Sequence, residues 1–496
     1  MKFPHSLCVA VTASVLTLGG MVVPALADET GAKPTPDPAE LASTQKVDAN
    51  HAVSLTIRKL IGDPTNDTSQ LKGLADVEFK VERIDVDLST ADGWKALSGM
   101  NAANASIDSS VTFGNLKTDS NGVAKISTAA NANFRVGAYR ITELQKGNYT
   151  VAPPFIVTLP FNQDGTWKYA QMVQPKNQEV KANKQVDDTG ATIGKPLSYT
   201  INAPVPAGDL TKFVITDPLV NELTLDHDSV EVTASGGKGD LALESGDYSV
   251  STEDHKLVVT FTDAGLKKLQ AQRKSDPALQ VHVAFQATLN SVPADGGKVT
   301  NTATVDLPNG GKVTTDTDSQ PTSTTFAPLT VTKTAQGTEA SKLSGAQFKL
   351  YLCKKGDDGK YQLLGDPVQV ADKDAAGANL SDTLTTDGTA TAKGYGVPAT
   401  SFSGGTTGEQ ANQYCVQETK APEGFFVNPE AQPVSYDKDK NTLTVSVQDE
   451  KDSVIGQLPA TGAWGLLIVL VVGGGLVARG VYAVSYTHLR AHETPE

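Results

Sequence analysis

Three strand-like segments late in the chain each place one ionisable side chain at the end of an apolar row. Side chains alternate across a strand, so residues two apart share a face. Lys333 follows the row of Leu329 and Val331, and Glu418 follows the row of Tyr414 and Val416. Asp449 follows the row of Leu443, Val445 and Val447. Isolated charges are costly to bury, so we expect the three groups to become neutral or to react. A neutral amine is a nucleophile and a protonated acid polarises a carbonyl, so such a trio could form an amide.

A second trio of this kind lies in the middle of the chain. Three apolar rows each contain one polar residue. Lys184 lies in the row of Val180, Ala182 and Val186, and Asp217 in the row of Phe213, Ile215 and Leu219. Asn301 lies in the row of Val299, Ala303 and Val305. A lysine, an acid and a carbonyl acceptor are again predicted to face one core. Two structural alternatives stay open. The late trio could be a surface lysine with solvated acids, and the middle trio could be an ordinary hydrogen-bonded cluster.

An internal repeat links the beginning of the chain to its end. Residues 55–59 (LTIRK) recur as 329–333 (LTVTK), and residues 139–143 (YRITE) recur as 414–418 (YCVQE). The lysine and the glutamate are almost equally far apart in both copies, so the two regions are predicted to share a fold. Lys59 and Glu143 are therefore in place, but no clear acceptor faces them. Asn177 is in phase with Trp167, Tyr169 and Val173, although Pro175 interrupts that strand.

Short runs of alternating apolar and polar residues predict the fold class. Residues 257–261 (LVVTF) and 443–447 (LTVSV) are typical, and clusters of Gly, Asp and Asn separate such runs. The one good helical stretch, residues 263–274, is too short for a parallel α/β fold. The length of 496 residues fits about three domains, with joints near Pro175 and near residues 326–328. We predict an all-β chain of sandwich domains.

Charge and cysteine content exclude several classes of protein. Lys plus Arg is 42 against 56 Asp plus Glu, a net charge of −14, which disfavours nucleic-acid binding. The three cysteines form no CxxC or Cys/His cluster, so no zinc or iron–sulfur site and no other cofactor is expected. Residues 1–27 read as a secretory signal peptide ending in Ala-Leu-Ala, which would remove Cys8. Cys353 and Cys415 would then form a disulfide outside the cell, the alternative being two buried thiols.

The end of the chain contains a recognisable signal. Leu458, Pro459, Ala460, Thr461 and Gly462 precede an apolar run over residues 463–478 and then Arg479. This pattern resembles the LPXTG cell-wall sorting signal of Gram-positive surface proteins. The resemblance implies that a sortase cysteine attacks the Thr461 carbonyl, that Gly462 leaves, and that the apolar run holds the chain in the membrane until then. Residues 485–496 lack the usual basic cluster and are interpreted as an atypical, foreign tail.

Two further resemblances assign roles to the trios. Residues 414–425 (YCVQETKAPEGF) resemble the E-box of Gram-positive pilins. By that analogy Lys333 is the nucleophile, Glu418 the proton shuttle and Asp449 the acceptor of a spontaneous isopeptide bond. The middle region resembles collagen-adhesin A-type isopeptide domains, with Lys184 joined to Asn301 under Asp217. The first and third domains would be of the B-type. Such links restrict the unfolded chain, as a disulfide does.

A fourth resemblance supplies a nucleophile for polymerisation. Residues 165–177, from Gly-Thr-Trp to Val-Gln-Pro-Lys-Asn, resemble the pilin motif, whose lysine attacks the sortase-bound threonine of the next subunit. Lys176 holds that position, on the strand face opposite Trp167, whereas Gln174 replaces the usual tyrosine. The alternative is a plain linker lysine.

These features predict the following organisation: signal peptide 1–27, flexible leader 28–46, Ig-like domains 47–178, 179–326 and 327–455, sorting signal with transmembrane segment 456–484, and tail 485–496. The resemblance is to backbone pilins of sortase-assembled fimbriae. It implies a non-enzymatic, wall-anchored subunit joined from Thr461 to Lys176 in a head-to-tail polymer. Partners would be a class C-type pilin sortase, a housekeeping sortase, minor or tip pilins, peptidoglycan and an unidentified host ligand.

Two alternatives compete with the fimbrial subunit. A monomeric wall-anchored adhesin for host matrix or glycans would need no Lys176. A wall-anchored hydrolase is disfavoured because the chain has no GxSxG or HExxH motif and no cysteine left for catalysis.

Overall fold

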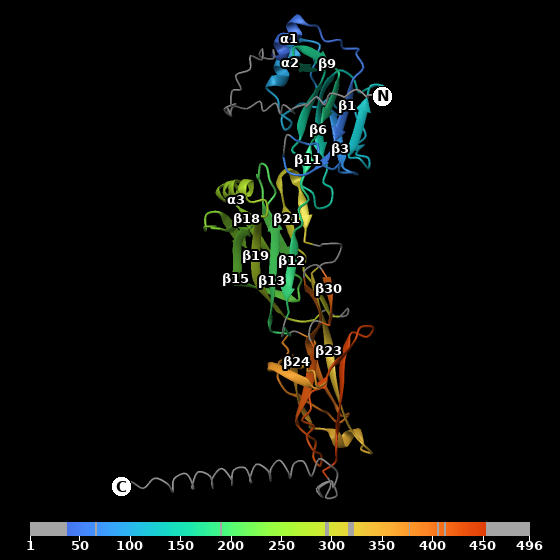
Figure 1. Ribbon diagram of the computed structural model, residues 1–496, viewed down its shortest axis with the longest axis vertical. Helices are drawn as coiled ribbons and strands as arrows, with labels where there is room; N and C mark the ends of the chain where they lie inside the picture. The colour runs from blue at the N-terminus through green and yellow to red at the C-terminus, as the bar shows by residue number, and fades with distance from the viewer. Residues whose placement is uncertain are drawn as a thin grey trace, which may run out of the picture.

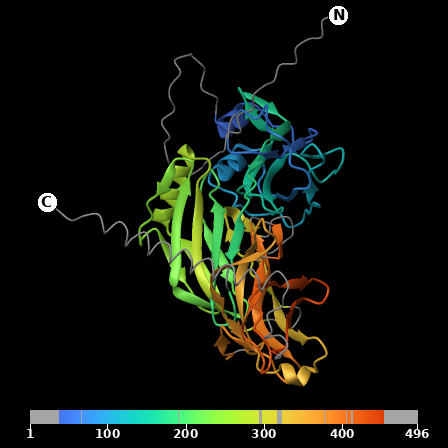
Figure 2. The ribbon, with the colours of Figure 1, turned by 60° about the horizontal axis from the view of Figure 1, so that its bottom comes forward.

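The computed structural model describes residues 37–452, apart from 65–66, 189–190, 293–296, 316–321, 376, 404–405 and 411–412. Buried apolar side chains form three clusters, within residues 41–167, 180–326 and 327–447, with Ala371 added to the second. We call the regions around them the first unit (37–178), the second unit (179–326) and the third unit (327–452). Figure 1 shows the units stacked along the long axis, and they stay distinct in the turned view of Figure 2.

The first unit is built mainly from two sheets that enclose its core. One contains β10 (Ala170–Val173), β1 (Ser54–Arg58) and β5 (Val123–Ser127), and the other contains β4 (Leu116–Lys117), β3 (Glu78–Arg83), β6 (Gly137–Glu143) and β7 (Phe155–Leu159). Two short pairs complete it: β11 (Lys176–Asn177) with β2 (Leu60–Ile61), and β8 (Phe161–Gln163) with β9 (Thr166–Lys168). Alternating burial along β1 and β3 directs one face of each strand inward.

Two short helices pack at the end of the first unit that lies away from the second unit (Figure 1). These are α1 (Pro38–Thr44) and α2 (Ala91–Ser98). We expected a flexible leader over residues 28–46, but its described part contains α1. An aspartate cap at Asp37, a proline in the first turn and burial of Leu41 explain the order there. Trp94 of α2 stacks on Trp167 with ring centroids 5.0 Å apart.

The second unit is a sandwich of two five-stranded sheets around one core. The first sheet contains β12 (Asn183–Asp187), β13 (Pro196–Pro204), β19 (Gln280–Leu289), β15 (Leu223–Gly236) and β16 (Gly239–Leu241). The second contains β17 (Tyr248–Ser251), β18 (Lys256–Phe261), β14 (Val214–Pro218), β21 (Thr304–Asp306) and β22 (Lys312–Thr314). The expected helix is present as α3 (Asp263–Ser275), capped by Thr262. A 3₁₀ turn, η1 (Pro308–Gly310), joins β21 to β22.

The third unit also has two sheets. The larger contains β27 (Leu380–Ser381), β26 (Val370–Ala371), β29 (Thr391–Ser403), β23 (Ser323–Ala335), β34 (Thr442–Asp449) and β33 (Ser435–Asp437), with β20 (Lys298–Thr300) and β30 (Thr406–Gln410) as side branches. The smaller contains β25 (Tyr361–Val368), β24 (Gln347–Lys355), β31 (Tyr414–Lys420) and β32 (Gln432–Pro433), with β28 (Leu384–Thr385) on β24. The 3₁₀ turn η2 (Ala340–Leu343) follows β23. The all-β class is confirmed.

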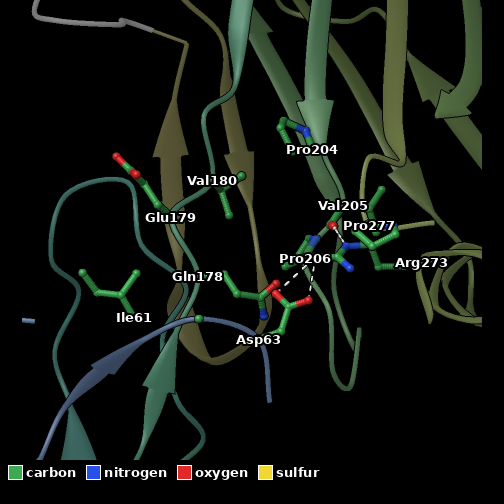
Figure 3. A pocket seen from close by; sticks show the side chains of 11 residues that line it. Ile61, Asp63, Gln178, Glu179, Val180, Pro204, Val205, Pro206, Arg273 and Pro277 are labelled. Atoms are coloured by element: carbon green, nitrogen blue, oxygen red, sulfur yellow. Dashed lines mark hydrogen bonds and ion pairs between the residues drawn. The ribbon is translucent and has the colours of Figure 1, made fainter. Parts of the chain in front are cut away.

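Polar contacts hold the first two units together. The Gln178 side chain donates to Ala207 O at 2.8 Å and accepts from Ala207 N at 2.6 Å. Arg273 lies 3.2 Å from Asp63 and donates to the Val205 carbonyl. This ion pair borders a cavity of about 220 Å³ at the junction, shown in Figure 3. Such side-chain contacts restrict how the two units can tilt.

The second and third units share a strand. The start of β23 pairs with β20 of the second unit, and its remainder pairs with β29 and β34 of the third. The joint expected near residues 326–328 therefore lies inside one continuous strand.

Candidate functional site

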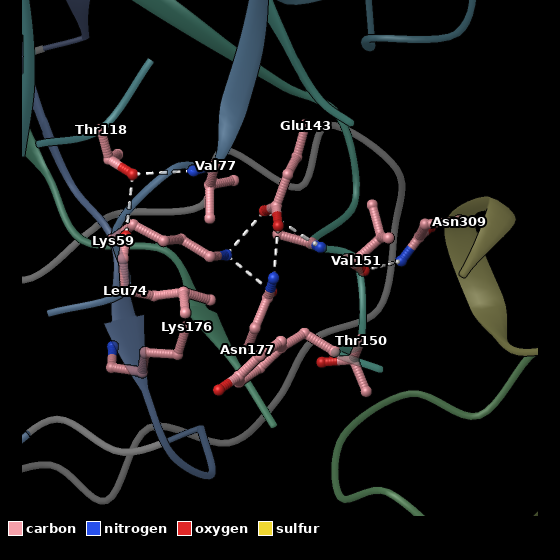
Figure 4. A network of polar contacts seen from close by, with 12 residues as sticks. Lys59, Leu74, Val77, Thr118, Glu143, Thr150, Val151, Lys176, Asn177 and Asn309 are labelled. Carbon is pink, nitrogen blue, oxygen red and sulfur yellow. Dashed lines mark hydrogen bonds and ion pairs between the residues drawn. The ribbon is translucent and has the colours of Figure 1, made fainter. Parts of the chain in front are cut away.

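The first unit buries a triangle of polar side chains. Lys59 lies between β1 and β2 and is 0% exposed. Its Nζ is 2.6 Å from Glu143 Oε2 and 2.6 Å from Asn177 Oδ1. The Asn177 amide donates in turn to Glu143 Oε1, and Figure 4 shows the closed triangle. Each member thus contacts the other two.

Burial sets the electrostatics of this triangle. It lowers the pKa of Lys59 to about 8, although the Glu143 carboxylate opposes the shift. Burial likewise raises the pKa of Glu143 against the opposing charge of Lys59. Both shifts favour the neutral amine and the neutral acid. A neutral amine beside a carboxamide and an acid can attack the amide carbon.

Strand register explains how Asn177 reaches the triangle. β10 pairs with β1 in parallel with Ile57 opposite Val173, and β11 pairs with β2 with Leu60 opposite Lys176. The phase is therefore unchanged across Pro175. In the sequence the proline made this phase unreliable, so Asn177 was left without an assignment. The signal that could have found it was the in-phase row through Trp167, Tyr169 and Val173.

The second unit places Lys184 against Asp217. Both residues are fully buried, Lys184 Nζ contacts Asp217 Oδ2, and the amine lies 4.7 Å from the centre of the Tyr199 ring. Asn301 is 2% exposed and shares a neighbour with Lys184. The backbone N–H of Asn301 donates to the backbone carbonyl of Thr322, and the Thr322 hydroxyl donates to the backbone carbonyl of Lys184 at 2.9 Å. The predicted trio thus converges on one part of the core.

Asn301 is also unusual in its hydrogen bonding. Among the described residues, neither its Oδ1 nor its Nδ2 has a hydrogen-bond partner, although both atoms are buried. A buried amide without partners carries a desolvation cost of about 1–3 kcal/mol.

The third unit repeats the triangle with different chemistry. Lys333 Nζ contacts Asp449 Oδ1 and lies 2.8 Å from Glu418 Oε1. The amine is 5.5 Å from the centre of the Phe348 ring, and Glu418 Oε2 accepts from Asn428 N at 2.7 Å. Burial raises the pKa of Glu418 to about 7, with the hydrogen bond to Asp449 adding to the shift and Lys333 opposing it. A protonated Glu418 can therefore donate to the carboxyl group of Asp449.

A disulfide joins β24 to β31 in the same unit. It links Cys353 to Cys415 across 62 residues, with Cα atoms 5.7 Å apart. The pairing expected from the sequence is present. The bond closes a loop that lies between Lys333 and Asp449 in the chain.

Lys176 lies beside the first triangle but outside it. Figure 4 shows its side chain turned away from Lys59 and Asn177. The side chain is half-buried, and its amine donates to Gln174 O at 3.4 Å. The Gln174 amide oxygen accepts from the Thr68 hydroxyl at 3.1 Å. Burial lowers the pKa of Lys176, which favours a nucleophilic amine.

Several predicted features lie outside the described residues. These are the signal peptide, residues 28–36 of the leader, the sorting signal at Leu458, Pro459, Ala460, Thr461 and Gly462, the apolar run and the tail. Within the described part of the chain, the helices are too short or too polar to cross a membrane.

Comparison with known proteins gives the fold a context. The family described as "Gram-positive pilin subunit D1, N-terminal domain" matches residues 50–178, and the family described as "Prealbumin-like fold domain" matches residues 327–451. These matches cover the triangles of the first and third units.

Relatives extend over nearly the whole chain. Fimbrial subunit type 1 of Actinomyces viscosus is 29% identical over 97% of this chain and 97% of the relative. Fimbrial subunit type 2 of Actinomyces naeslundii is 27% identical over 91% of this chain and 92% of the relative. The full-length major pilin SpaD of Corynebacterium diphtheriae superimposes with a TM-score of 0.61 and 26% identity, over 82% of this chain and 99% of that structure. The chain is therefore similar over nearly its whole length to fimbrial subunits and major pilins of Gram-positive bacteria, and these findings support a structural pilus subunit.

Proposed function

We propose that this subunit polymerises covalently, through an amide between Thr461 of one copy and Lys176 of the next. A sortase cysteine would displace Gly462 from the Thr461 carbonyl and form a thioester. The Lys176 amine would then attack that carbonyl, lose a proton and release the cysteine thiol. The observation that carries this proposal is the separation of Lys176 from its buried neighbours. Its amine remains outside the triangle that holds Asn177.

We further propose that each unit closes an internal isopeptide bond. The amine of Lys59, Lys184 or Lys333 attacks the carbonyl carbon of Asn177, Asn301 or Asp449. Glu143, Asp217 or Glu418 carries a proton from the amine to the leaving group, which departs as ammonia from asparagine and as water from aspartate. In all three units the lysine amine contacts a buried acid, and in the first and third units it also contacts the proposed acceptor, which supports this assignment.

The proposed domain limits are 47–178, 179–326 and 327–455, supported by the three separate cores. The mature subunit would stand in a surface fimbrium anchored to peptidoglycan by a housekeeping sortase, after assembly by a class C-type pilin sortase. Minor or tip pilins would share the fibre, and adhesion to a host surface would be a second role.

Intact mass tests the internal bonds directly. For the secreted ectodomain we expect a loss of about 17 Da for each lysine–asparagine bond, about 18 Da for the lysine–aspartate bond and about 2 Da for the disulfide. Lys184→Ala, Lys59→Ala and Lys333→Ala should each abolish one loss. An unmodified mass in the folded wild-type protein would refute the internal bonds.

Denaturing gels test the polymer. Wild-type cells should give a high-molecular-weight ladder that Lys176→Ala abolishes, and tandem mass spectrometry should find a Thr461–Lys176 peptide. Lys181→Ala is a matched control, because Lys181 is an exposed lysine close by in the sequence. A ladder that persists in Lys176→Ala would show that another lysine links the subunits, whereas wild-type cells without a ladder would favour the monomeric adhesin.

A further inference from the structure

Two consecutive apolar residues are exposed where the described chain ends. Phe426 is 45% exposed and Val427 is 43% exposed, and together we call them the apolar tip. Backbone contacts hold the tip beside the final residues, because Phe426 N donates to Glu450 O at 3.0 Å and Asp452 N donates to Gly424 O at 2.8 Å. The tip therefore lies next to the point from which the chain continues toward Thr461.

Chain length limits where the tip can lie in a polymer. Nine residue steps separate Asp452 from Thr461, which span at most about 30 Å when fully extended. If Thr461 is joined to Lys176 of a second copy, the tip lies within reach of the surface of that copy around Lys176. This step rests on the function proposed above.

The sheet that leads to Lys176 offers a matching face. Met172 of β10 lies opposite Thr56 of β1, and Thr56 lies opposite Lys125 of β5. Met172 is 47% exposed, and Lys125 is also exposed. Burial alternates along these strands, so the outer face comprises Ala170, Met172, Ser54, Thr56, Arg58, Val123, Lys125 and Ser127. We call it the outer face of β1.

Charge is complementary between the two surfaces. The outer face of β1 contains two cations, Arg58 and Lys125, and no acidic residue. Around the apolar tip, residues 422–428 and 450–452 contain the acids Glu423, Glu450 and Asp452 and one base, Lys451. Opposite net charges with an apolar centre are typical of specific protein interfaces.

We infer that the apolar tip of one subunit docks on the outer face of β1 of the next copy, beside Lys176. Phe426 and Val427 pack there on Met172, and the acidic residues around the tip face Arg58 and Lys125. This contact adds a non-covalent interface to the covalent joint. It also raises the local concentration of Thr461 near the attacking amine.

One-directional dimerisation tests the contact. Donor subunits carry Lys176→Ala and acceptor subunits carry Thr461→Ala, so that only one covalent dimer can form with the sortase. The double change Phe426→Ser and Val427→Ser in the donor should slow dimer formation about tenfold, since apolar burial is lost. Leu364→Ser, on the equally exposed Leu364 of β25, is the matched control and should leave the rate unchanged. Met172→Ser in the acceptor should add little to the donor defect, because both changes remove one contact.

Photo-crosslinking gives a second, independent measurement. With p-benzoylphenylalanine at position 426, mature fibres should yield peptides joined to residues 54–58, 123–127 or 170–176 of another copy. The same probe at position 364 should not. Equal dimerisation rates for tip and control variants, or crosslinks only to other regions, would overturn the docking inference and leave the covalent polymer intact. Failure of the unaltered donor and acceptor to form any dimer would overturn both.

Discussion

The first and third units each bury a lysine beside two polar side chains, with the same strand register but different residues. Lys333 lies opposite Val447 on the parallel strand β34, and Asp449, the proposed acceptor, follows two residues later. In the first unit the register of β10 and β11 places Lys59 opposite Pro175, and Asn177 follows two residues later. The same register therefore accommodates a carboxyl group at Asp449 and a carboxamide at Asn177.

The difference between the two strands has a functional consequence. β34 is continuous over residues 442–449, whereas Pro175 separates β10 from β11. Proline removes one ladder hydrogen bond and is tolerated at a sheet edge. In the first unit the residue before Asn177 is Lys176, and in the third the residue before Asp449 is Gln448. The same position thus contributes a candidate nucleophile in one unit and a neutral side chain in the other.

The largest expected effect comes from removing the attacking lysines. The proposed bonds span 118 residues in the first unit and 116 in the third, so chain entropy predicts nearly equal stabilisation. Lys59→Ala and Lys333→Ala should each lower the unfolding free energy of their own unit by about 5 kcal/mol. Hydrogen exchange of peptides from β1 and β23 measures each unit separately. A loss confined to one variant would show that only one triangle closes.

Removing the disulfide should affect the third unit alone. Cys353→Ser together with Cys415→Ser opens a 62-residue loop and should cost about 2–4 kcal/mol. Hydrogen exchange should rise in β24 and β31, while peptides of the first unit serve as the internal control. The comparison fails if the first unit loosens as well.

With closure blocked, Lys59 should make the first unit more stable as pH rises above about 8, whereas Glu418 should make the third unit less stable as pH rises from 4.5. Asn177→Ala keeps Lys59, whose pKa is lowered from 10.5 to about 8, so the unfolded chain binds its proton more tightly. Stability of the first unit should then rise as pH rises from about 8 to 10.5. Asp449→Ala keeps Glu418, whose burial still raises its pKa above 4.5, so stability of the third unit should fall as pH rises from 4.5.

Denaturant unfolding of the intact variants measures both trends across this pH range. Hydrogen exchange in peptides of β1 and β23 reports the unfolding midpoint of each unit. Identical profiles for the two variants would contradict the assignment of the amine in one unit and the acid in the other as the dominant titrating group.

The smallest expected effect comes from making the first unit resemble the third at one position. Pro175→Val restores an N–H and should change stability by at most about 1 kcal/mol, because Asn177 already holds the required register. Intact mass should still show closure of the bond. A variant that no longer loses about 17 Da would show that the proline itself positions the acceptor.

Much of the site was predictable because strand periodicity is local. The rows that contain Lys184 and Lys333 are uninterrupted, and each predicted partner acid contacts its lysine in the structure. Asn177 was not assigned, because a proline can end a strand or be carried within one, and residues 173–177 alone do not distinguish these outcomes. The helix α1 was missed for a similar reason, since its polar sequence is held by packing of Leu41 on the core.

Residue type and spacing alone identified candidate nucleophiles, acids and carbonyl groups, because these groups keep their chemistry wherever the chain carries them. Tertiary structure decided which of them meet. It brought Asn177 to Lys59 across 118 residues, turned Lys176 away from that contact, and placed Phe426 beside the exit of the chain. Such contacts depend on how sheets pack across long stretches of sequence, and no local pattern encodes them.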